Sequence, residues 1–181
     1  DYDNLRIVIL FMVNEIENDQ LIEETMLELE IRSEQAMIEL GEVLGERVKP
    51  GDLLFLSGDL GAGKTTLVKG IAKGMGIESD ITSPTFQLLK TYHGKFTLNH
   101  LDLYRLGPEP DVEILELEDL ATEGVMVIEW GDCVKDSLFN EYLEVVIGFC
   151  EAVDSRDVTF IPSGVRYERL IEELHNVDFR S

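Results

Sequence analysis

Residues 53–66 read LLFLSGDLGAGKTT, and this stretch decides the fold class. The apolar run Leu53–Leu56 predicts a strand that is buried on both faces of a sheet. A helix is expected from about Lys64 to Met75, ending near Gly76. Between strand and helix, Gly58–Thr65 matches the pattern G-x-x-x-x-G-K-[ST], in which backbone N–H groups surround phosphate oxygens. The sequence therefore predicts a phosphate-binding loop that connects a buried strand to a helix.

Each residue type in this loop has a chemical reason. Lys64 is expected to reach the β- and γ-phosphates of a nucleotide, and the Thr65 hydroxyl to bind Mg²⁺. The start of the following helix adds a partial positive charge. By composition alone, such a match arises by accident in fewer than about 1% of chains of this length. The expected nucleotide contacts are Asp59, Leu60, Gly61, Ala62, Gly63, Lys64, Thr65 and Thr66.

Strand and helix patterns alternate along the rest of the chain. Ser33 is expected to cap a helix that runs to about Arg47. Further strands are expected at Met26–Ile31 (an edge strand), Gln87–Tyr92, Lys95–Tyr104, Val125–Ile128, Tyr142–Cys150 and Val158–Ile161, with helices at Asp111–Glu123 and Arg166–His175. We expect an α/β protein with the three-layer P-loop NTPase fold, a mainly parallel sheet and antiparallel edge strands.

The domain organisation is simple. Residues 26–181 are expected to form a single P-loop ATPase domain. Residues 1–25 are assigned to an N-terminal extension that is a candidate for a non-native or poorly ordered segment. Within it, Ile7–Val13 has the pattern of a strand, and Met12 is a candidate for the natural start. Whether residues 1–11 are native stays open.

Charge and composition exclude several classes of function. The net charge of -22 would repel nucleic acid, which proteins grip through basic surfaces. The chain has two cysteines, which do not suggest a disulfide framework and fit a reducing compartment. Its three histidines are scattered, which argues against a zinc site. No apolar run approaches the ~20 residues that cross a bilayer. We expect a cytoplasmic protein with no membrane contact.

Polar residues at strand ends are the candidate partners of the loop. Glu129 follows an apolar run, and ligands of open α/β sheets bind beyond the carboxyl ends of the strands, so a role in holding Mg²⁺ is expected. Asp102 shares one strand face with His100 and Tyr104. On spacing alone, His100 and Asp102 fit the polar face of an edge strand at least as well as they fit a nucleotide site. Thr85, after Pro84, is a candidate for sensing the γ-phosphate through its hydroxyl.

Four motifs in order resemble one family. They are SGDLGAGKTT at 57–66, SPTF at 83–86, HLDLYRL at 100–106 and VIEW at 127–130. Their order and spacing resemble the TsaE (YjeE) family, bacterial P-loop ATPases of tRNA threonylcarbamoyladenosine biosynthesis, over roughly residues 33–156. The sequence departs from the family pattern in places, among them Met37, where many members have Thr, and Gly131, where Pro is common.

The resemblance implies an ATP- and Mg²⁺-dependent accessory enzyme that acts on the TsaB–TsaD complex and meets tRNA only indirectly. It implies that Thr65 and Glu129 bind the metal and that Asp102 and Trp130 line the nucleotide site. Thr85 then falls in a switch-like loop, and Ser33 and Arg156 match positions near the nucleotide. The expected catalytic residues are Lys64, Asp102 and Glu129, with the general base left open between the two acids.

Two other functions remain as alternatives. A small-molecule kinase uses the same loop but usually adds a lid with arginines, and no Arg-rich segment follows Arg47. A nucleotide-sensing module would bind ATP without hydrolysing it. The absence of an Asn-Lys-x-Asp run, which reads guanine in GTPases, is weak support for ATP. The sequence gives neither the oligomeric state nor the turnover rate.

Overall fold

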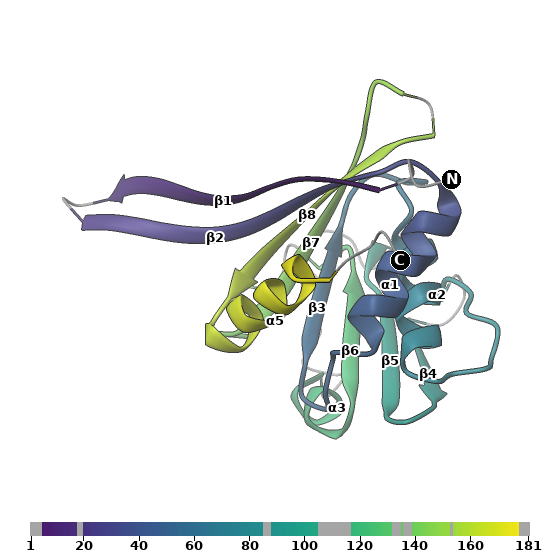
Figure 1. Ribbon diagram of the computed structural model, residues 1–181. Helices are drawn as coiled ribbons and strands as arrows, with labels where there is room; N and C mark the ends of the chain where they lie inside the picture. The colour runs from purple at the N-terminus through teal and green to yellow at the C-terminus, as the bar shows by residue number, and fades with distance from the viewer. Residues whose placement is uncertain are drawn as a thin grey trace.

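A computed structural model gives the arrangement of the chain (Figure 1). It describes residues 5–17, 20–84, 88–104, 117–131, 135, 139–152 and 154–177. The elements, in chain order, are β1 (Leu5–Glu17), β2 (Gln20–Ile31), α1 (Glu34–Gly45), β3 (Leu53–Ser57), α2 (Lys64–Gly74), β4 (Leu89–His93), β5 (Thr97–Asp102), α3 (Leu117–Glu123), β6 (Val125–Glu129), β7 (Tyr142–Phe149), β8 (Arg156–Ser163) and α5 (Val165–His175).

Within the described part of the chain, eight strands form one sheet in the order β1-β2-β8-β7-β3-β6-β5-β4. Strand β3 pairs in parallel with β6 and β7, and β5 pairs in parallel with β6. The neighbours on both sides of this middle are antiparallel. The expected mixed α/β fold with antiparallel edges is confirmed, although the antiparallel part is wider than the sequence pattern indicated.

The middle strands are apolar because helices or connecting segments cover both faces of the sheet. Leu54 and Leu56 of β3 belong to the buried cluster that includes residues of α1, α2 and α5. Leu53 and Phe55 face the other way and pack in a second cluster with α3 residues such as Leu117. Helices α1, α2 and α5 lie in front of the sheet in Figure 1. Burial on both faces explains why β3 shows a continuous apolar run rather than alternation.

Helices α1 and α2 pack with their backbones almost in contact. A Cβ placed on Gly70 would lie 2.2 Å from the carbonyl oxygen of Ile38 and 2.8 Å from the Cα of Gly41. A Cβ on Gly41 would lie 2.4 Å from the carbonyl oxygen of Leu67. Only glycine fits where two helix backbones come this close. This contact holds the start of α1 beside the start of α2, and both helix starts border the candidate site.

The N-terminal strands differ from the sequence expectation. Strand β2 contains the predicted strand Met26–Ile31, and its residues Leu27, Leu29 and Ile31 are buried in alternation. The prediction that this is an edge strand is wrong, because β1 pairs with one side of β2 and β8 with the other. The β1–β2 hairpin extends beyond the helices in Figure 1. The domain boundary at residue 25 stays a prediction.

The remaining elements lie close to their predicted ranges. The helix that starts at Ser33 ends at Gly45 rather than Arg47. Of the expected helix Asp111–Glu123, residues 111–116 lie outside the described residues, and α3 covers the rest. Among the described residues, no helix is both long enough and apolar enough to span a membrane.

Candidate functional site

The glycine loop follows the carboxyl end of β3 and leads into α2, as the sequence predicts. Its turns need backbone angles that side chains disfavour, since Gly58, Gly61 and Gly63 all have positive φ. At Gly58 the space is also closed, because a Cβ would lie 2.4 Å from the carbonyl oxygen of Ile147 on β7. The neighbouring strand therefore fixes the start of the loop.

Lys64 lies across the inside of this loop. Its ammonium group donates hydrogen bonds to the carbonyl oxygens of Gly58, at 2.6 Å, and Asp59, at 3.1 Å. The same nitrogen lies 4.1 Å from the centroid of the Trp130 ring, a cation–π distance. The residue is only 5% exposed. A buried ammonium group held by its own loop is well placed to meet a phosphate oxygen.

Parallel pairing brings Glu129 beside the loop. Leu56 and Glu129 are register partners on β3 and β6, so the carboxyl ends of both strands meet at one edge. The Thr65 hydroxyl donates to Oε1 of Glu129 at 3.3 Å. Nε2 of His100 lies 2.8 Å from the same oxygen. Glu129 is 3% exposed, so a carboxylate is held in a nearly closed environment by two neighbours.

Asp102 stands next to Glu129, because these residues are register partners on β5 and β6. Its Oδ1 accepts from the backbone N–H of Tyr104 at 3.0 Å, and its Oδ2 accepts from the Ser83 hydroxyl at 3.4 Å. The interpretation of an edge-strand polar face is wrong, since β4 covers the outer side of β5. His100 on that face is fully buried. Asp102 and Tyr104 of that face line the cavity beside β6.

Trp130 directly follows Glu129 and adopts an unusual backbone conformation. Its φ of 60° lies in the left-handed region, which large side chains rarely occupy. Such conformations persist only where the surrounding structure holds them, and they concentrate at functional sites. The ring packs against Tyr104, with the centroids 4.9 Å apart. This turn places the indole over Lys64.

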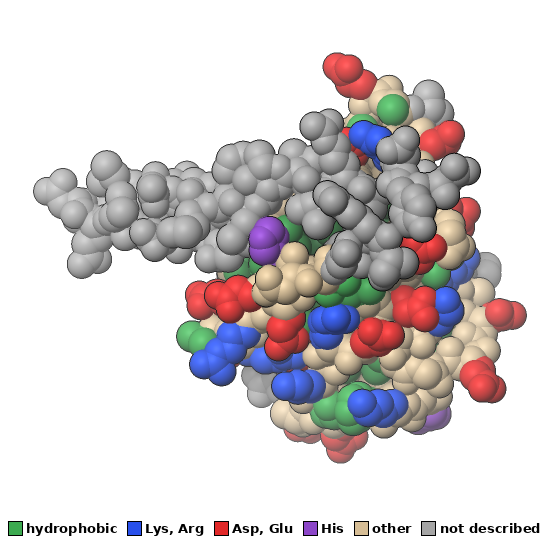
Figure 2. Space-filling model, viewed as in Figure 1, with side chains coloured by type: hydrophobic (Ala, Val, Ile, Leu, Met, Phe, Trp, Pro, Cys, Tyr) green, Lys and Arg blue, Asp and Glu red, His purple; other side chains and the backbone are tan. Residues whose placement is uncertain are grey.

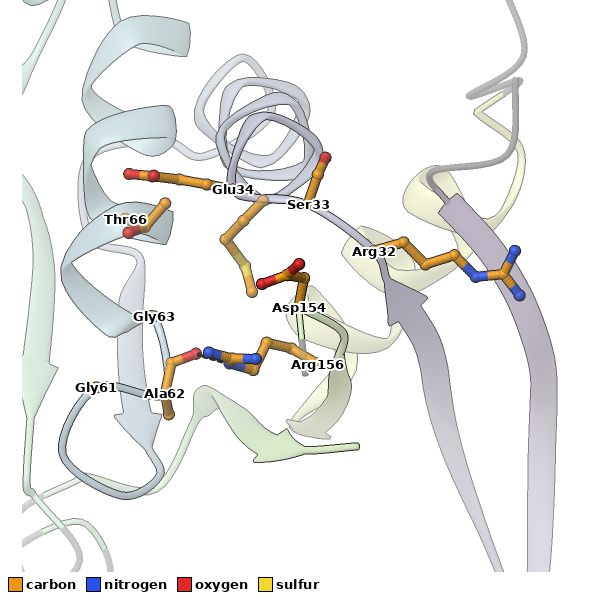
Figure 3. Close-up of a pocket in the computed structure, with 10 residues that line it drawn as sticks. Arg32, Ser33, Glu34, Gly61, Ala62, Gly63, Thr66, Asp154 and Arg156 are labelled. Carbon is orange, nitrogen blue, oxygen red and sulfur yellow. Dashed lines mark hydrogen bonds between the residues drawn. The ribbon is translucent and has the colours of Figure 1, made fainter. Parts of the chain in front are cut away.

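Two cavities flank the loop. The first cavity, beside β6, has a volume of about 470 Å³ and is lined by Leu60, Gly61, Gly63, Lys64, Thr65, Thr66, Ser83, Asp102, Tyr104, Glu129 and Trp130. The one beside α1 has a volume of about 490 Å³ and is lined by Arg32, Ser33, Glu34, Met37, Gly61, Ala62, Gly63, Thr66, Asp154 and Arg156 (Figure 3). Gly61, Gly63 and Thr66 border both, so one extended ligand can contact both across the loop.

Arg156 and Ser33 line the second cavity, which is the one beside α1. Nε of Arg156 donates to the carbonyl oxygen of Ala62 at 3.0 Å, which ties β8 to the loop (Figure 3). The guanidinium carbon lies 4.5 Å from the centroid of the Phe149 ring. The Ser33 hydroxyl accepts from the N–H of Ala36 at 3.1 Å, which confirms its predicted role as the cap of α1.

The oxygen donors of the first cavity fit a magnesium ion that is shared with a nucleotide. Thr65 and Glu129 offer two oxygens at one point, and Asp102 borders the same cavity. Among the described residues, no group of three or more His, Cys, Asp or Glu side chains could hold a metal alone. Mg²⁺ typically takes one or two protein ligands and completes its shell with water and phosphate oxygens.

The structure brings most of the predicted site residues together around the loop. Thr85 lies outside the described residues, and the roles of all the predicted site residues stay predictions. Sequence reasoning missed five cavity-lining residues, which are Arg32, Glu34, Ser83, Tyr104 and Asp154. Tyr104 had a usable signal, since strand alternation placed it on the face of Asp102. Asp154 had none, because its position depends on how β8 folds back beside the loop.

The fold and the site define a mixed α/β protein with a glycine-rich loop and a lysine at the carboxyl ends of parallel strands. The family model described as "Threonylcarbamoyl adenosine biosynthesis protein TsaE" matches residues 31–157, and the chain belongs to this family.

Individual relatives agree with the family assignment. The chain is 45% identical over 132 residues to the Bacillus subtilis (strain 168) protein named tRNA threonylcarbamoyladenosine biosynthesis protein TsaE, covering 72% of this chain and 82% of that protein. A Treponema pallidum (strain Nichols) protein of the same name is 43% identical over 129 residues, covering 71% and 95%. The crystal structure of Bacillus subtilis YdiB superposes with a TM-score of 0.71 at 35% identity, covering 83% of this chain and 94% of that one.

Proposed function

We propose that this chain is a Mg²⁺-dependent ATPase that serves threonylcarbamoyladenosine modification of tRNA by acting on the TsaB–TsaD complex. The observation that carries the proposal is the contact between Thr65 and Glu129 beside the glycine loop, in a member of the TsaE family. The buried clusters on both sheet faces support a three-layer P-loop NTPase fold. Membership of the TsaE family supports the role in tRNA modification, and the geometry of the site supports ATP hydrolysis.

The proposed role of the glycine loop is to bind and orient the triphosphate of ATP. Backbone N–H groups from Asp59 to Thr66 surround the phosphate oxygens, and α2 directs its positive end at them. Lys64 exchanges its carbonyl partners in the loop for β- and γ-phosphate oxygens. Charge on these oxygens grows as the γ-phosphoryl group is transferred, so donors fixed in advance lower the barrier.

Thr65 and Glu129 are the proposed protein ligands of Mg²⁺. When bound, Mg²⁺ neutralises charge on the phosphate oxygens and helps to orient the leaving group. Glu129 can take this role because two hydrogen bonds fix its carboxylate at the cavity wall. Asp102 is the better candidate for orienting the attacking water, since a metal ligand makes a poor base. Water would attack the γ-phosphorus, the bond to the bridging oxygen would break, and ADP and phosphate would leave.

The second cavity is the proposed place for the nucleoside. Ser33 and Arg156 border it from α1 and β8, and Trp130 borders the phosphate side of the site. Arg156 would act partly through the loop, because its hydrogen bond to Ala62 holds the loop backbone.

Surface charge supports indirect contact with tRNA. Figure 2 shows acidic and basic side chains interspersed on the face that carries α1 and α5. A net charge of -22 disfavours a large phosphate-binding surface, whereas docking on other proteins has no such requirement. The proposed role therefore places this chain in the cytoplasm, on the TsaB–TsaD complex, with tRNA held by its partners.

Reconstitution tests the pathway role. TsaB, TsaD, the activated threonylcarbamoyl donor and unmodified tRNA are mixed with wild-type chain, with Lys64→Ala or with neither, and modified adenosine is quantified over many turnovers. We expect sustained modification only with the wild type. Equal modification in all three mixtures would contradict the proposal. ATP consumption that follows one added metabolite would instead identify a kinase, and ATP binding without phosphate release a sensor.

A further inference from the structure

We propose that His100 is a positioning residue that fixes the carboxylate of Glu129 in the orientation required for Mg²⁺ binding, an inference that rests on the proposed function. His100 is fully buried in β5 and does not line either cavity. Its Nε2 lies 2.8 Å from Oε1 of Glu129. Within the part of the chain that the structure describes, its hydrogen bond to Glu129 links it to the site.

The contact determines which ring nitrogen carries the proton. An ionised carboxylate only accepts hydrogen bonds, so the partner nitrogen must donate, and Nε2 therefore carries the hydrogen. Among the described residues, Nδ1 of His100 has no hydrogen-bond partner. A hydrogen on Nδ1 would then be a buried, unpaired donor, which is costly. Nε2–H of His100 therefore donates to Oε1 of Glu129.

The two hydrogen bonds to Glu129 converge on one atom. Thr65 donates to Oε1 from the loop side, and His100 donates to Oε1 from within the sheet. Oε2 is the oxygen that neither of them engages. Because a longer side chain such as glutamate rotates freely at its end, the donor from His100 selects one orientation of the carboxylate. Loss of a hydrogen-bond partner that orients a metal-binding side chain typically lowers metal affinity or activity by about 10–100-fold.

The position of His100 argues against a purely structural role. Its register partner on β6 is Val127, and the flanking strand residue Leu101 is fully buried as well. An apolar side chain would fill the same space without an unpaired polar atom. A polar group that is buried among apolar side chains lowers the stability of the protein unless it forms a hydrogen bond. Among the described residues, the one hydrogen-bond partner of the His100 ring is the carboxylate of Glu129.

Three substitutions separate positioning from packing. Glutamine at position 100 keeps an amide N–H near the place of Nε2, asparagine is too short to reach Glu129, and leucine keeps the volume without a donor. Asn99→Leu is the matched control, since Asn99 is a buried polar residue on the opposite face of β5 whose bonds go to Thr91 and Leu120. It removes buried hydrogen bonds from the same strand and leaves Glu129 untouched.

The readout is Mg²⁺ binding rather than activity alone. The only tryptophan of the chain, Trp130, lines the first cavity and reports on it by fluorescence. Mg²⁺ is titrated into protein saturated with a non-hydrolysable ATP analogue. We expect His100→Leu and His100→Asn to raise the half-saturating Mg²⁺ concentration at least about 10-fold. Metal-free nucleotide affinity should change less than about 2-fold, and His100→Gln should restore Mg²⁺ binding to within about 3-fold of wild type.

The outcomes are distinguishable. Wild-type Mg²⁺ binding in His100→Asn, or failure of His100→Gln to restore it, overturns the inference while the proposed function stands. An effect of Asn99→Leu as large as that of His100→Leu also overturns it. A wild-type chain that shows no Mg²⁺ dependence in fluorescence or phosphate release overturns the proposed function and this inference with it. If His100→Leu fails to fold, the comparison of Mg²⁺ binding between His100→Asn and His100→Gln tests the inference.

Discussion

The Thr65 hydroxyl lies 3.3 Å from Oε1 of Glu129, although 64 positions separate the two residues in the sequence. The parallel register of β3 and β6 produces this contact, because it pairs Leu56 with Glu129 and brings both strand ends to one edge. The first residues of α2 and the last residue of β6 then meet. A hydroxyl and a carboxylate oxygen therefore meet beside the glycine loop.

Glu129→Gln tests the charge of this contact. Glutamine keeps the size of the side chain but removes the negative charge that holds a cation. We expect Mg²⁺-dependent phosphate release to fall about 100-fold, while metal-free ATP binding stays near wild type. Single-turnover hydrolysis and fluorescence titration measure the two quantities. Glu168→Gln, at an exposed position of α5, is the control and should behave as wild type. Unchanged hydrolysis in Glu129→Gln would rule out Glu129 as a metal ligand.

Arg156→Lys tests the support of the loop from β8. Lysine keeps the positive charge but cannot donate as Nε of Arg156 does to the carbonyl oxygen of Ala62. We expect ATP affinity to fall about 10-fold, the equivalent of one hydrogen bond to a charged group. Isothermal titration with a non-hydrolysable analogue measures it, and Arg169→Lys on the exposed side of α5 serves as control. Equal affinity in both variants would show that charge alone is sufficient at position 156.

Gly70→Ala tests the close packing of α1 and α2. Alanine normally stabilises a helix relative to glycine by about 1 kcal/mol. Here its Cβ would meet the carbonyl oxygen of Ile38 at 2.2 Å, so the helices must separate. We expect a net loss of about 1–3 kcal/mol in the free energy of unfolding, measured by urea denaturation. Lys69→Ala, on the exposed side of α2, should change stability by less than about 0.5 kcal/mol. A more stable Gly70→Ala protein would contradict the close contact.

Tyr167→Phe tests a buried hydroxyl beneath β3. The Tyr167 oxygen accepts a hydrogen bond from the N–H of Leu53 at 2.8 Å, and burial raises the pKa of this phenol from 10.0 to about 12. Between these pH values the unfolded tyrosine ionises while the folded one keeps its proton. Because the folded state then binds more protons, its stability is intact below pH 10 and falls as the pH rises toward about 12.

The phenylalanine variant should lose this alkaline step while being less stable at neutral pH, by about 1–3 kcal/mol, because the N–H of Leu53 is left unpaired. Urea denaturation of both proteins from pH 8 upward gives the comparison. An identical pH dependence in the two proteins would show that the Tyr167 pKa is not raised.

Local signals made the loop and its elements predictable. The glycine pattern, the apolar strand before it and the helix after it lie in one continuous stretch, and the structure reproduces them. Glu129 was predictable through one general rule, because the carboxyl ends of parallel strands share an edge. Ser33 was predictable because capping depends on the nearest backbone N–H groups.

The features that sequence patterns missed depend on the order of strands in the sheet. The pattern indicated an edge strand for Asp102 and His100, but β4 takes the edge position and β5 is an interior strand in which His100 is fully buried. Strand β2 likewise became interior because β1 pairs with its outer side. Pairing between distant segments leaves no mark in the local alternation of side chains. The contact of Gly41 with Gly70 likewise requires knowledge of how two helices cross.

The most direct test of the proposed ATPase activity is phosphate release from ATP by the purified chain, with and without the TsaB–TsaD pair, for wild type and Lys64→Ala. The account predicts slow, Mg²⁺-dependent release by the wild type that the pair stimulates and that disappears in the variant. Release that is insensitive to Mg²⁺, to the pair and to Lys64→Ala would contradict it.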